Sequence, residues 1–331
     1  MRLFSSFFSS YWGMYMFQSV LHSLVTLFIV ERALDIWDVK SPVARFRYRV
    51  SVIVLPVFMF PVFQHINPER GSFYFRQESA VFDGSRWLGL ELWGGVPVGI
   101  IFFTAALMLT TAVMFLQEIA PILRESLSGS SGYASEPAGS EIQDIIEELL
   151  KGAEVPVPDV EVIDEERPVI FSTGTREHSI LLSNSLIHAL DRQQLKSALA
   201  HELAHIIRRS NMTTFLIFLM RIVMFYNPVS LIVFRRIVQD DEHVCDDITV
   251  SITGEPAVLA STLKVFYSAV PTGPYSLKKV KEVIENSSHN LLLKERITRL
   301  ENEEGFGDNI FRWERFALTM AAVAALSYFV V

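Results

Sequence analysis

The chain has 331 residues, of which 50% are apolar and only 20% are charged, and its mean hydropathy is +0.31. These values exclude a disordered chain and disfavour an ordinary soluble globule, because 25 Phe and nine Tyr side chains exceed what one aqueous core of this length would bury. The net charge of −8 excludes a nucleic-acid partner, since no basic stripe can neutralise phosphates. A single cysteine, Cys245, excludes an internal disulfide and a cysteine-based zinc knuckle.

Four apolar runs predict transmembrane helices that place the chain in a lipid bilayer. The first, about residues 3–30, carries no charged side chain and is longer than the roughly 30 Å hydrocarbon layer requires. A cleaved signal peptide is the alternative, but no small-residue cleavage site follows this run. The next two cover about 50–66, whose prolines lipid tolerates, and 92–117. The last, 313–331, is short for a span and begins at an interfacial aromatic anchor, Trp313.

The basic residues of the loops predict the orientation, because Lys and Arg collect on the cytoplasmic side of a membrane. Five of them lie in residues 31–49 and only three in 67–91. We therefore expect the N-terminus outside and the long segment 121–312 in the cytoplasm.

The polar part of the chain is expected to form a domain of helices and strands over 140–312. A Ser/Gly-rich stretch within 121–139 predicts a flexible linker before it. Ser140 precedes an apolar stripe with helical spacing, which predicts the first helix. Runs of β-branched residues over 155–163, 168–171 and 179–182 predict a small sheet with a hairpin.

The sequence His201-Glu202-Leu-Ala-His205 lies inside a strong predicted helix, 193–209. Residues four apart stand about 40° apart around a helix, so both imidazoles face one side and can share a metal ion, with Glu202 at the edge of that face. This is the pattern of zinc peptidases, in which the histidines bind Zn²⁺ and the glutamate is the general base. The alternative, two surface histidines on an amphipathic helix, is disfavoured by the apolar flanks of the motif.

A catalytic zinc site needs a third protein ligand. The metzincin arrangement is excluded, because Arg208 and Asn211 stand where it requires Gly and His. Downstream, Glu242 and Asp246 are four residues apart and so face the same way on a helix. We assign Glu242 as the third ligand, and Asp246 as the carboxylate that accepts the outer N–H of a zinc-bound imidazole.

The neighbours of these two carboxylates are given other roles. His243 points about 100° away from Glu242, so it is expected at the surface or in packing, with ligation as the alternative. Cys245 is expected to be a buried packing residue. A solvated acidic face is expected for the remaining carboxylates, Asp240, Asp241 and Asp247.

Residues 170–300 resemble the gluzincin domain of integral-membrane zinc metallopeptidases. The shared motifs are HELAHIIRRSN from His201, YNP from Tyr226 and EHVCDD from Glu242. The likeness is stronger to the membrane peptidases of bacterial β-lactam sensors and their antirepressor-cleaving relatives, which have E-x-x-C-D, than to the CAAX prenyl proteases, which usually have E-x-x-A-D, or to the membrane heat-shock protease. In those sensors an extracellular penicillin-binding domain follows the last span, so we do not expect antibiotic sensing by an attached domain in a sequence that stops at Val331.

This resemblance implies an α-helical membrane protein with an α+β zincin-like (gluzincin) metallopeptidase domain, located in a bacterial cell membrane. It also implies that the segment 169–183 supplies an edge strand for a substrate peptide, and that Arg296 is a structural arginine near the site.

The segment 212–234 is almost wholly apolar, but Arg221 and the pair Asn227-Pro228 argue against one spanning helix. Two shorter helices joined at that pair are expected. Two placements stay open: a hairpin packed on or dipping into the inner leaflet, and a hairpin buried in the soluble domain.

These features predict a membrane-embedded zinc endopeptidase that hydrolyses peptide bonds of a protein or peptide substrate, with regulated signalling proteolysis as one setting. His289 is considered as a donor to the oxyanion. The alternative is a non-catalytic membrane signalling or scaffold protein with a structural zinc domain. Glu202 argues against it, because a structural site has no use for a general base.

Overall fold

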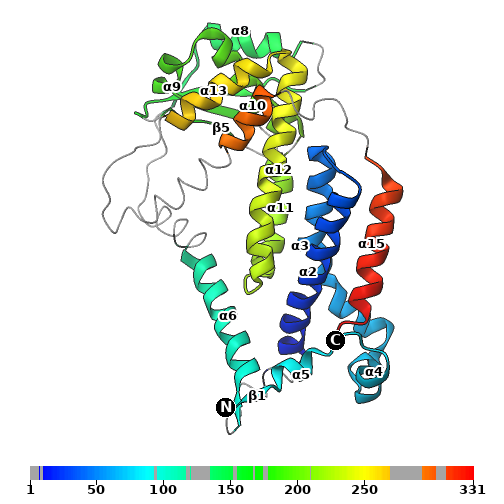
Figure 1. The fold of residues 1–331 in the computed structure, drawn as a ribbon. Coiled ribbons are helices and arrows are strands. Elements are labelled where there is room, and N and C mark those ends of the chain that lie inside the picture. Colours follow the sequence, from blue (N-terminus) through cyan, green and yellow to red (C-terminus); the bar gives the residue numbers. More distant parts are fainter. Residues whose placement is uncertain are drawn as a thin grey trace. The chain divides into compact units, whose positions relative to one another are not determined.

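The computed structural model describes the chain at residue 7 and over 10–92, 95–116, 120, 135–151, 155–166, 168–173, 178–208, 210–268, 293–302 and 311–331. The chain divides into two compact units, whose elements are drawn in Figure 1. The helical unit comprises Met1–Ser130, Phe215–Val238 and Ile310–Val331, and the mixed unit comprises Ser131–Thr214 and Gln239–Asn309.

Two long apolar helices, α2 (Tyr11–Ile36) and α3 (Pro42–Ile66), lie side by side in the helical unit (Figure 1). Each begins at a serine cap, because the hydroxyls of Ser10 and Ser41 accept a hydrogen bond from the amide three residues further on. Both helices are long and apolar enough to cross a membrane.

The second of these helices differs from the expected span 50–66, because it begins at Pro42. Proline suits the first helical position, where a backbone N–H would have no partner in the helix. Three of the five basic residues in 31–49, Arg45, Arg47 and Arg49, therefore lie in the first turns of α3 and not in a loop. Arg49 is buried there because its guanidinium pairs with Glu31 of α2, with 3.1 Å between Nε and Oε1.

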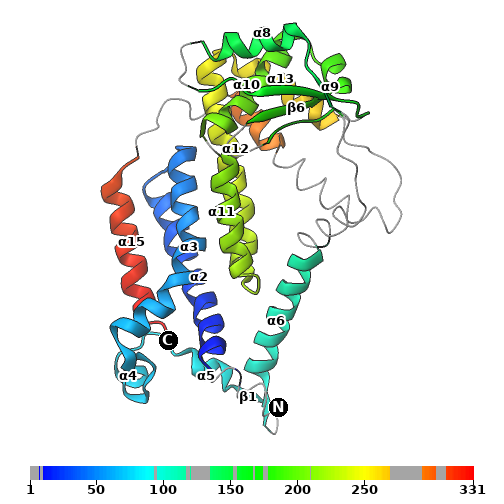
Figure 2. The ribbon, with the colours of Figure 1, turned by 180° about the vertical axis from the view of Figure 1, so that it is seen from behind.

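Shorter elements complete the helical unit (Figure 2). The expected third span, 92–117, is shorter at its start, because residues 91–92 pair with residues 96–97 as short antiparallel strands and the helix begins only at Val98. The last helix packs on α2 and α3. In chain order these elements are η1 (Pro68–Gly71), α4 (Phe73–Glu78), α5 (Gly84–Leu88), β1 (Glu91–Leu92), β2 (Val96–Pro97), α6 (Val98–Met114) and α15 (Trp313–Tyr328).

The helices α11 (Ser210–Val223) and α12 (Pro228–Thr253) meet at a turn that is bonded to α2. The hydroxyl of Tyr226 lies 2.7 Å from Oγ of Ser19, and Nδ2 of Asn227 donates to Oγ of Ser23 at 2.7 Å. The second helix runs well past residue 234, where the expected hairpin ended. It ends only before a glycine in the left-handed region, with φ of +72° at residue 254. It therefore carries Glu242 within a continuous helix.

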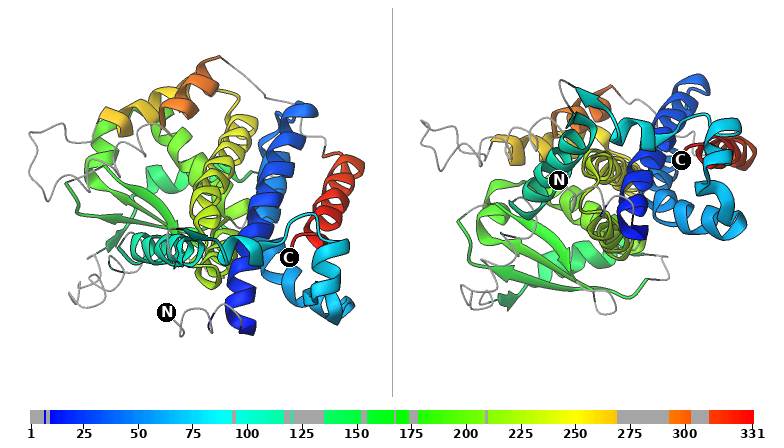
Figure 3. Two further views of the ribbon diagram at one scale, coloured as in Figure 1. Left: turned by 60° about the horizontal axis from the view of Figure 1, so that its bottom comes forward. Right: turned by 90° about the horizontal axis from the view of Figure 1, so that it is seen from below.

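The mixed unit contains a four-stranded sheet in the order β3-β4-β6-β5, whose strands are the green arrows in Figure 3. Its strands are β3 (Ser135–Pro137), β4 (Asp159–Ile163), β5 (Ile170–Thr173) and β6 (Ser179–Ser183). The pair β4–β6 is parallel and the other two pairs are antiparallel, so β5 is an edge strand next to β6. The expected linker 121–139 thus ends in a strand, and its part 121–134 lies outside the described residues.

The core of the mixed unit lies between this sheet and three helices, α8 (Ser140–Leu149), α9 (Asn184–Ala189) and α10 (Arg192–Arg208). The apolar residues of α8 and α10 recur at helical spacing, so each helix buries one stripe against the strands. The helix α13 (Pro256–Ser268) packs on α10, and a further helical segment covers 293–301. This packing fixes α10, which carries the histidine motif.

Candidate metal centre

The histidine motif is held in α10, whose start is defined by a reciprocal cap. Oδ1 of Asp191 accepts from the amide of Gln194 at 2.8 Å, and Oε1 of Gln194 accepts from the amide of Asp191 at 3.2 Å. Further along, His201 and Glu202 are 9% and 7% exposed. The helix therefore presents these two side chains inside the unit and not to solvent.

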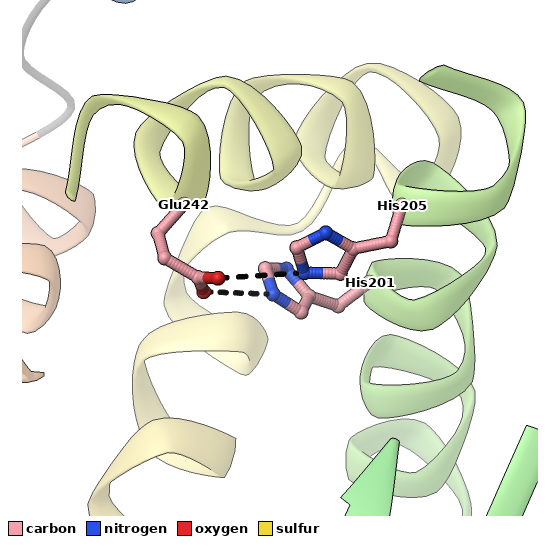
Figure 4. A group of neighbouring side chains, drawn as sticks. All are labelled: His201, His205 and Glu242. Atoms are coloured by element: carbon pink, nitrogen blue, oxygen red, sulfur yellow. Dashed lines mark ion pairs between the residues drawn. The ribbon is translucent and has the colours of Figure 1, made fainter. Parts of the chain in front are cut away.

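Three side chains from two helices converge on one point (Figure 4). Nε2 of His201 lies 3.4 Å from Oε2 of Glu242, and Nε2 of His205 lies 3.6 Å from Oε1 of the same carboxylate. The two imidazole rings meet edge to face, with 4.9 Å between their centres. One donor atom from each of the three residues lies within 4.8 Å of the others, so one ion can contact all three.

This donor set fits a zinc ion. Two imidazole nitrogens and one carboxylate are a usual set for catalytic zinc, which keeps its fourth position for water or substrate. Both histidines turn Nε2 toward Glu242, and Nδ1 of His201 lies 3.3 Å from Oδ1 of Asp246, which is fully buried. A carboxylate on the outer nitrogen is the support that orients a zinc-binding imidazole. The structure thus brings together all four residues that the sequence assigned to the metal and its support.

A buried guanidinium joins the two carboxylates of the site. Arg296, in the helical segment 293–301, donates from Nη1 to Oε2 of Glu242 at 2.7 Å. Its Nε and Nη2 donate to the two oxygens of Asp246 at 2.9 and 2.7 Å, a bidentate pair. The resemblance implied a structural arginine near the site, and the structure shows that this arginine contacts the assigned third ligand directly.

Burial and charge together set the protonation of the three converging residues. Burial alone would raise the pKa of Glu242, but the charge of Arg296 and the contact with His201 hold this pKa well below its ordinary value. Burial acts to lower the pKa of His201, yet its contact with Glu242 outweighs this and the pKa is raised. Burial and the charge of His201 lower the pKa of His205. Glu242 is therefore ionised, as a metal ligand must be.

A cavity of about 500 Å³ opens at this point. One wall is formed by residues 168–172, which include part of β5, and another by His201, Glu202, His205 and Glu242. Much of the remaining wall is apolar, from Leu259, Leu263 and Phe266 of α13 together with Leu293. Glu202 therefore shares one cavity with the assigned ligands and with an edge strand.

The expected acidic face on α12 is wrong. Asp240 and Asp241 are only 2% and 4% exposed. Oδ1 of Asp241 lies 2.8 Å from Nη1 of Arg208 on α10, and Oδ1 of Asp247 lies 2.5 Å from Nη2 of Arg299. Spacing along α12 shows which residues share a face, but the arginines that cover that face come from other segments.

Three further residues were considered in the sequence, namely His243, His289 and Cys245, and of these Cys245 contacts the site. His243 is not among the three converging side chains, and burial lowers its pKa to about 4. His289 lies outside the described residues. Cys245 is fully buried as expected, but its Sγ also lies 3.3 Å from Nδ1 of His205, a contact that our sequence reasoning missed. Its position three residues after Glu242 was a usable signal, because residues three apart share a helix face.

Comparison with known proteins finds peptidases whose matched segment includes the three assigned ligands of this site. Residues 99–258, just under half of the chain, match the family model described as BlaR1 peptidase M56. The chain is 36% identical over 77 residues to a protease HtpX homolog of Thermodesulfovibrio yellowstonii, covering 23% of this chain and 27% of that protein. It is 36% identical over 84 residues to protease HtpX of Legionella pneumophila, covering 24% and 30% of the two chains. An HtpX homolog of Streptococcus gordonii is 23% identical over 117 residues, covering 35% and 39%.

These comparisons confirm the predicted resemblance to membrane zinc metallopeptidases, and with it the predicted fold class. Together with the two long apolar helices α2 and α3, they support a membrane protein. The chain spans only about a quarter to two fifths of the length of these three relatives.

Proposed function

We propose that this chain is a membrane-embedded zinc endopeptidase that hydrolyses peptide bonds of a protein substrate. The observation that carries the proposal is the convergence of His201, His205 and Glu242 on one point, in a cavity that Glu202 also lines. A structural zinc site would be closed by a fourth protein ligand. Among the described residues, the group around His201 has three, which argues against a non-catalytic scaffold protein with a structural zinc domain.

His201, His205 and Glu242 would hold the zinc ion, which when bound supplies a Lewis acid for the scissile carbonyl and for the attacking water. The carboxylate of Glu202 takes a proton from that water and delivers it to the leaving amine. Asp246 orients His201, and Arg296 holds the buried carboxylates of Glu242 and Asp246 in place.

The edge strand β5 supports a role in holding the substrate backbone. The amide of Ser183 donates to the carbonyl of Val169, and the amide of Val169 donates to Oγ of Ser183, so Val169 faces β6. Because backbone groups alternate along a strand, those of Ile170 point away from β6. Ile170 lines the cavity. We infer that an extended substrate segment pairs with it, with an apolar side chain against the wall from α13.

The peptidase proposal is tested by Glu202→Gln. This substitution keeps the shape of the side chain and removes no assigned ligand, so the purified variant should hold close to one zinc per chain. Cleavage should fall by about 10²–10⁴-fold, because the general base is lost. Comparing new protein N-termini in the membranes of cells that carry either form would identify the substrate. If Glu202→Gln cleaves that substrate at the normal rate, the proposed mechanism is wrong.

The role of β5 is tested by Ile170→Pro. Proline removes an N–H that points away from β6, and edge strands accept it. We expect kcat/KM for the identified substrate to fall about fivefold, the effect of one net hydrogen bond of ~1 kcal/mol. The matched variant Phe171→Pro also replaces a large apolar residue, but it removes an N–H that faces β6 and should instead reduce hydrogen-exchange protection of β6. An unchanged kcat/KM in Ile170→Pro would show that the substrate is not paired with β5.

We further propose that α2, α3, α6 and α15 cross the membrane and that the mixed unit lies in the cytoplasm. The proposal rests on the five basic residues of 31–49 against three in 67–91, because Lys and Arg collect at the cytoplasmic ends of membrane helices. Cysteines introduced at the exposed positions Ser79 and Ser140 test this. A membrane-impermeant maleimide should label Ser79→Cys in intact cells and Ser140→Cys only after permeabilisation. The native Cys245 is fully buried and gives little background. The opposite labelling pattern would reverse the orientation and change the pool of substrates.

A further inference from the structure

The second ring nitrogens of His201 and His205 both meet side chains of α12. Nδ1 of His201 lies 3.3 Å from Oδ1 of Asp246, and Nδ1 of His205 lies 3.3 Å from Sγ of Cys245. Glu242, Cys245 and Asp246 stand at positions i, i+3 and i+4, which share one face of a helix. On one face of α12, Glu242 thus lies next to the Nε2 atoms of both histidines. One turn later, Asp246 and Cys245 contact the Nδ1 atoms of His201 and His205.

The surroundings of Cys245 hold its side chain in one place. Cys245 is fully buried, and Asp241, one turn before it on α12, is 4% exposed. One donor atom from each of His205, Asp241 and Cys245 lies within 4.8 Å of the others. Arg208, three residues after His205 on α10, pairs with Asp241 at 2.8 Å. This ion pair links α10 to α12 next to the ring of His205, so the contact between His205 and Cys245 is fixed from both helices.

We propose that Cys245 is a positioning residue for His205, as Asp246 is for His201. When Nε2 of His205 binds a metal ion, Nδ1 carries the proton and donates it to Sγ of Cys245, which fixes the tautomer and the plane of the ring. The inference rests on the zinc ligands of the proposed function. The competing interpretation is a second zinc ion held by His205, Asp241 and Cys245. The two interpretations differ in the number of zinc ions that the wild-type chain holds, which is one with a positioning residue and two with a second metal site.

The test compares Cys245→Ala, Cys245→Ser and a control, Val244→Ala, in the detergent-solubilised full chain. Val244 is 3% exposed, neighbours Cys245 on α12 and does not line the cavity, so its truncation removes buried volume alone. The readouts are the number of zinc ions per chain, the zinc Kd measured by competition with a chelator, and the absorption spectrum of the cobalt-substituted chain. Cobalt absorption reports ligand geometry, which loss of packing at Val244 would not change.

Cys245→Ala should raise the zinc Kd about tenfold, the lower end of the range for residues that support a ligand, because sulfur is a weak acceptor. It should also shift the cobalt spectrum. Cys245→Ser restores an acceptor and should return the Kd to within about threefold of the wild-type value, and Val244→Ala should change neither quantity.

Three results would overturn the proposal: an unchanged Kd and spectrum in Cys245→Ala, an equal loss in Cys245→Ser and Cys245→Ala, or two zinc ions in the wild-type chain that fall to one in Cys245→Ala. None of these measurements uses cleavage. The proposal therefore fails separately from the peptidase mechanism, which Glu202→Gln tests.

Discussion

Glu242→Ala is expected to leave the purified chain almost free of zinc. Glu242 supplies the carboxylate of the three-residue donor group, and its two oxygens lie 3.4 and 3.6 Å from the Nε2 atoms of His201 and His205. Residues that only support a ligand change metal affinity by about 10–100-fold. Loss of a direct ligand should exceed that range. Metal analysis after dialysis against a weak chelator measures the effect.

The neighbouring residue His243 provides the matched control for this experiment. It lies next to Glu242 on α12, is partly buried, and was the alternative ligand suggested by the sequence. His243→Ala should keep close to one zinc per chain, since its side chain is not part of the donor group around His201. If Glu242→Ala retains full zinc while substitution of Asp241, His243 or Asp246 empties the site, the ligand assignment is wrong.

The assigned site residues could be found in the sequence because helix geometry places them. The spacing of His201, Glu202 and His205 sets their directions on any helix, and the spacing of Glu242 and Asp246 does the same for α12. The pair Asn227-Pro228 likewise indicated the turn between α11 and α12. The start of α3 was missed although Ser41-Pro42 is a local start signal, because the basic residues after it were interpreted as a loop.

Contacts between distant segments could not be predicted in this way. The sequence shows that Asp241 and Asp247 lie on α12, but not that Arg208 and Arg299 cover them, so they were placed in solvent. The same limit applies to Arg296. Its contacts with Glu242 and Asp246 join residues about 50 positions apart, and no periodic pattern encodes such a distance.

Arg296→Ala is expected to destabilise the zinc-free mixed unit by about 3–5 kcal/mol at pH 7, because it leaves the buried Asp246 and the largely buried Glu242 without their common cation. Arg296→Lys should lose less stability than Arg296→Ala, because it keeps a positive charge. It should still be less stable than the wild type, since an ammonium group cannot make the bidentate pair with Asp246. The measurement is hydrogen exchange of α10 and α12 in the full chain with a chelator present. Tryptophan fluorescence would not serve, because all five tryptophans lie in the helical unit.

The pH dependence of this loss separates charge compensation from simple packing. In the wild type, Arg296 holds the pKa of Glu242 below its ordinary 4.5, so this contribution to stability is present above that value and is lost as the pH falls. In Arg296→Ala, the cation that lowers the pKa of Glu242 most is lost, while burial still raises this pKa and His201 and His205 still lower it. The carboxylate therefore takes up a proton at a higher pH than in the wild type, and mild acid relieves part of the penalty. The difference in stability between wild type and variant should therefore shrink from pH 7 toward pH 4.

Lys264→Ala is the control, because it removes an exposed pair with Glu301 and should cost at most about 1 kcal/mol at either pH. A difference that stays constant between pH 7 and pH 4 would show that Arg296 acts through packing and not through its charge.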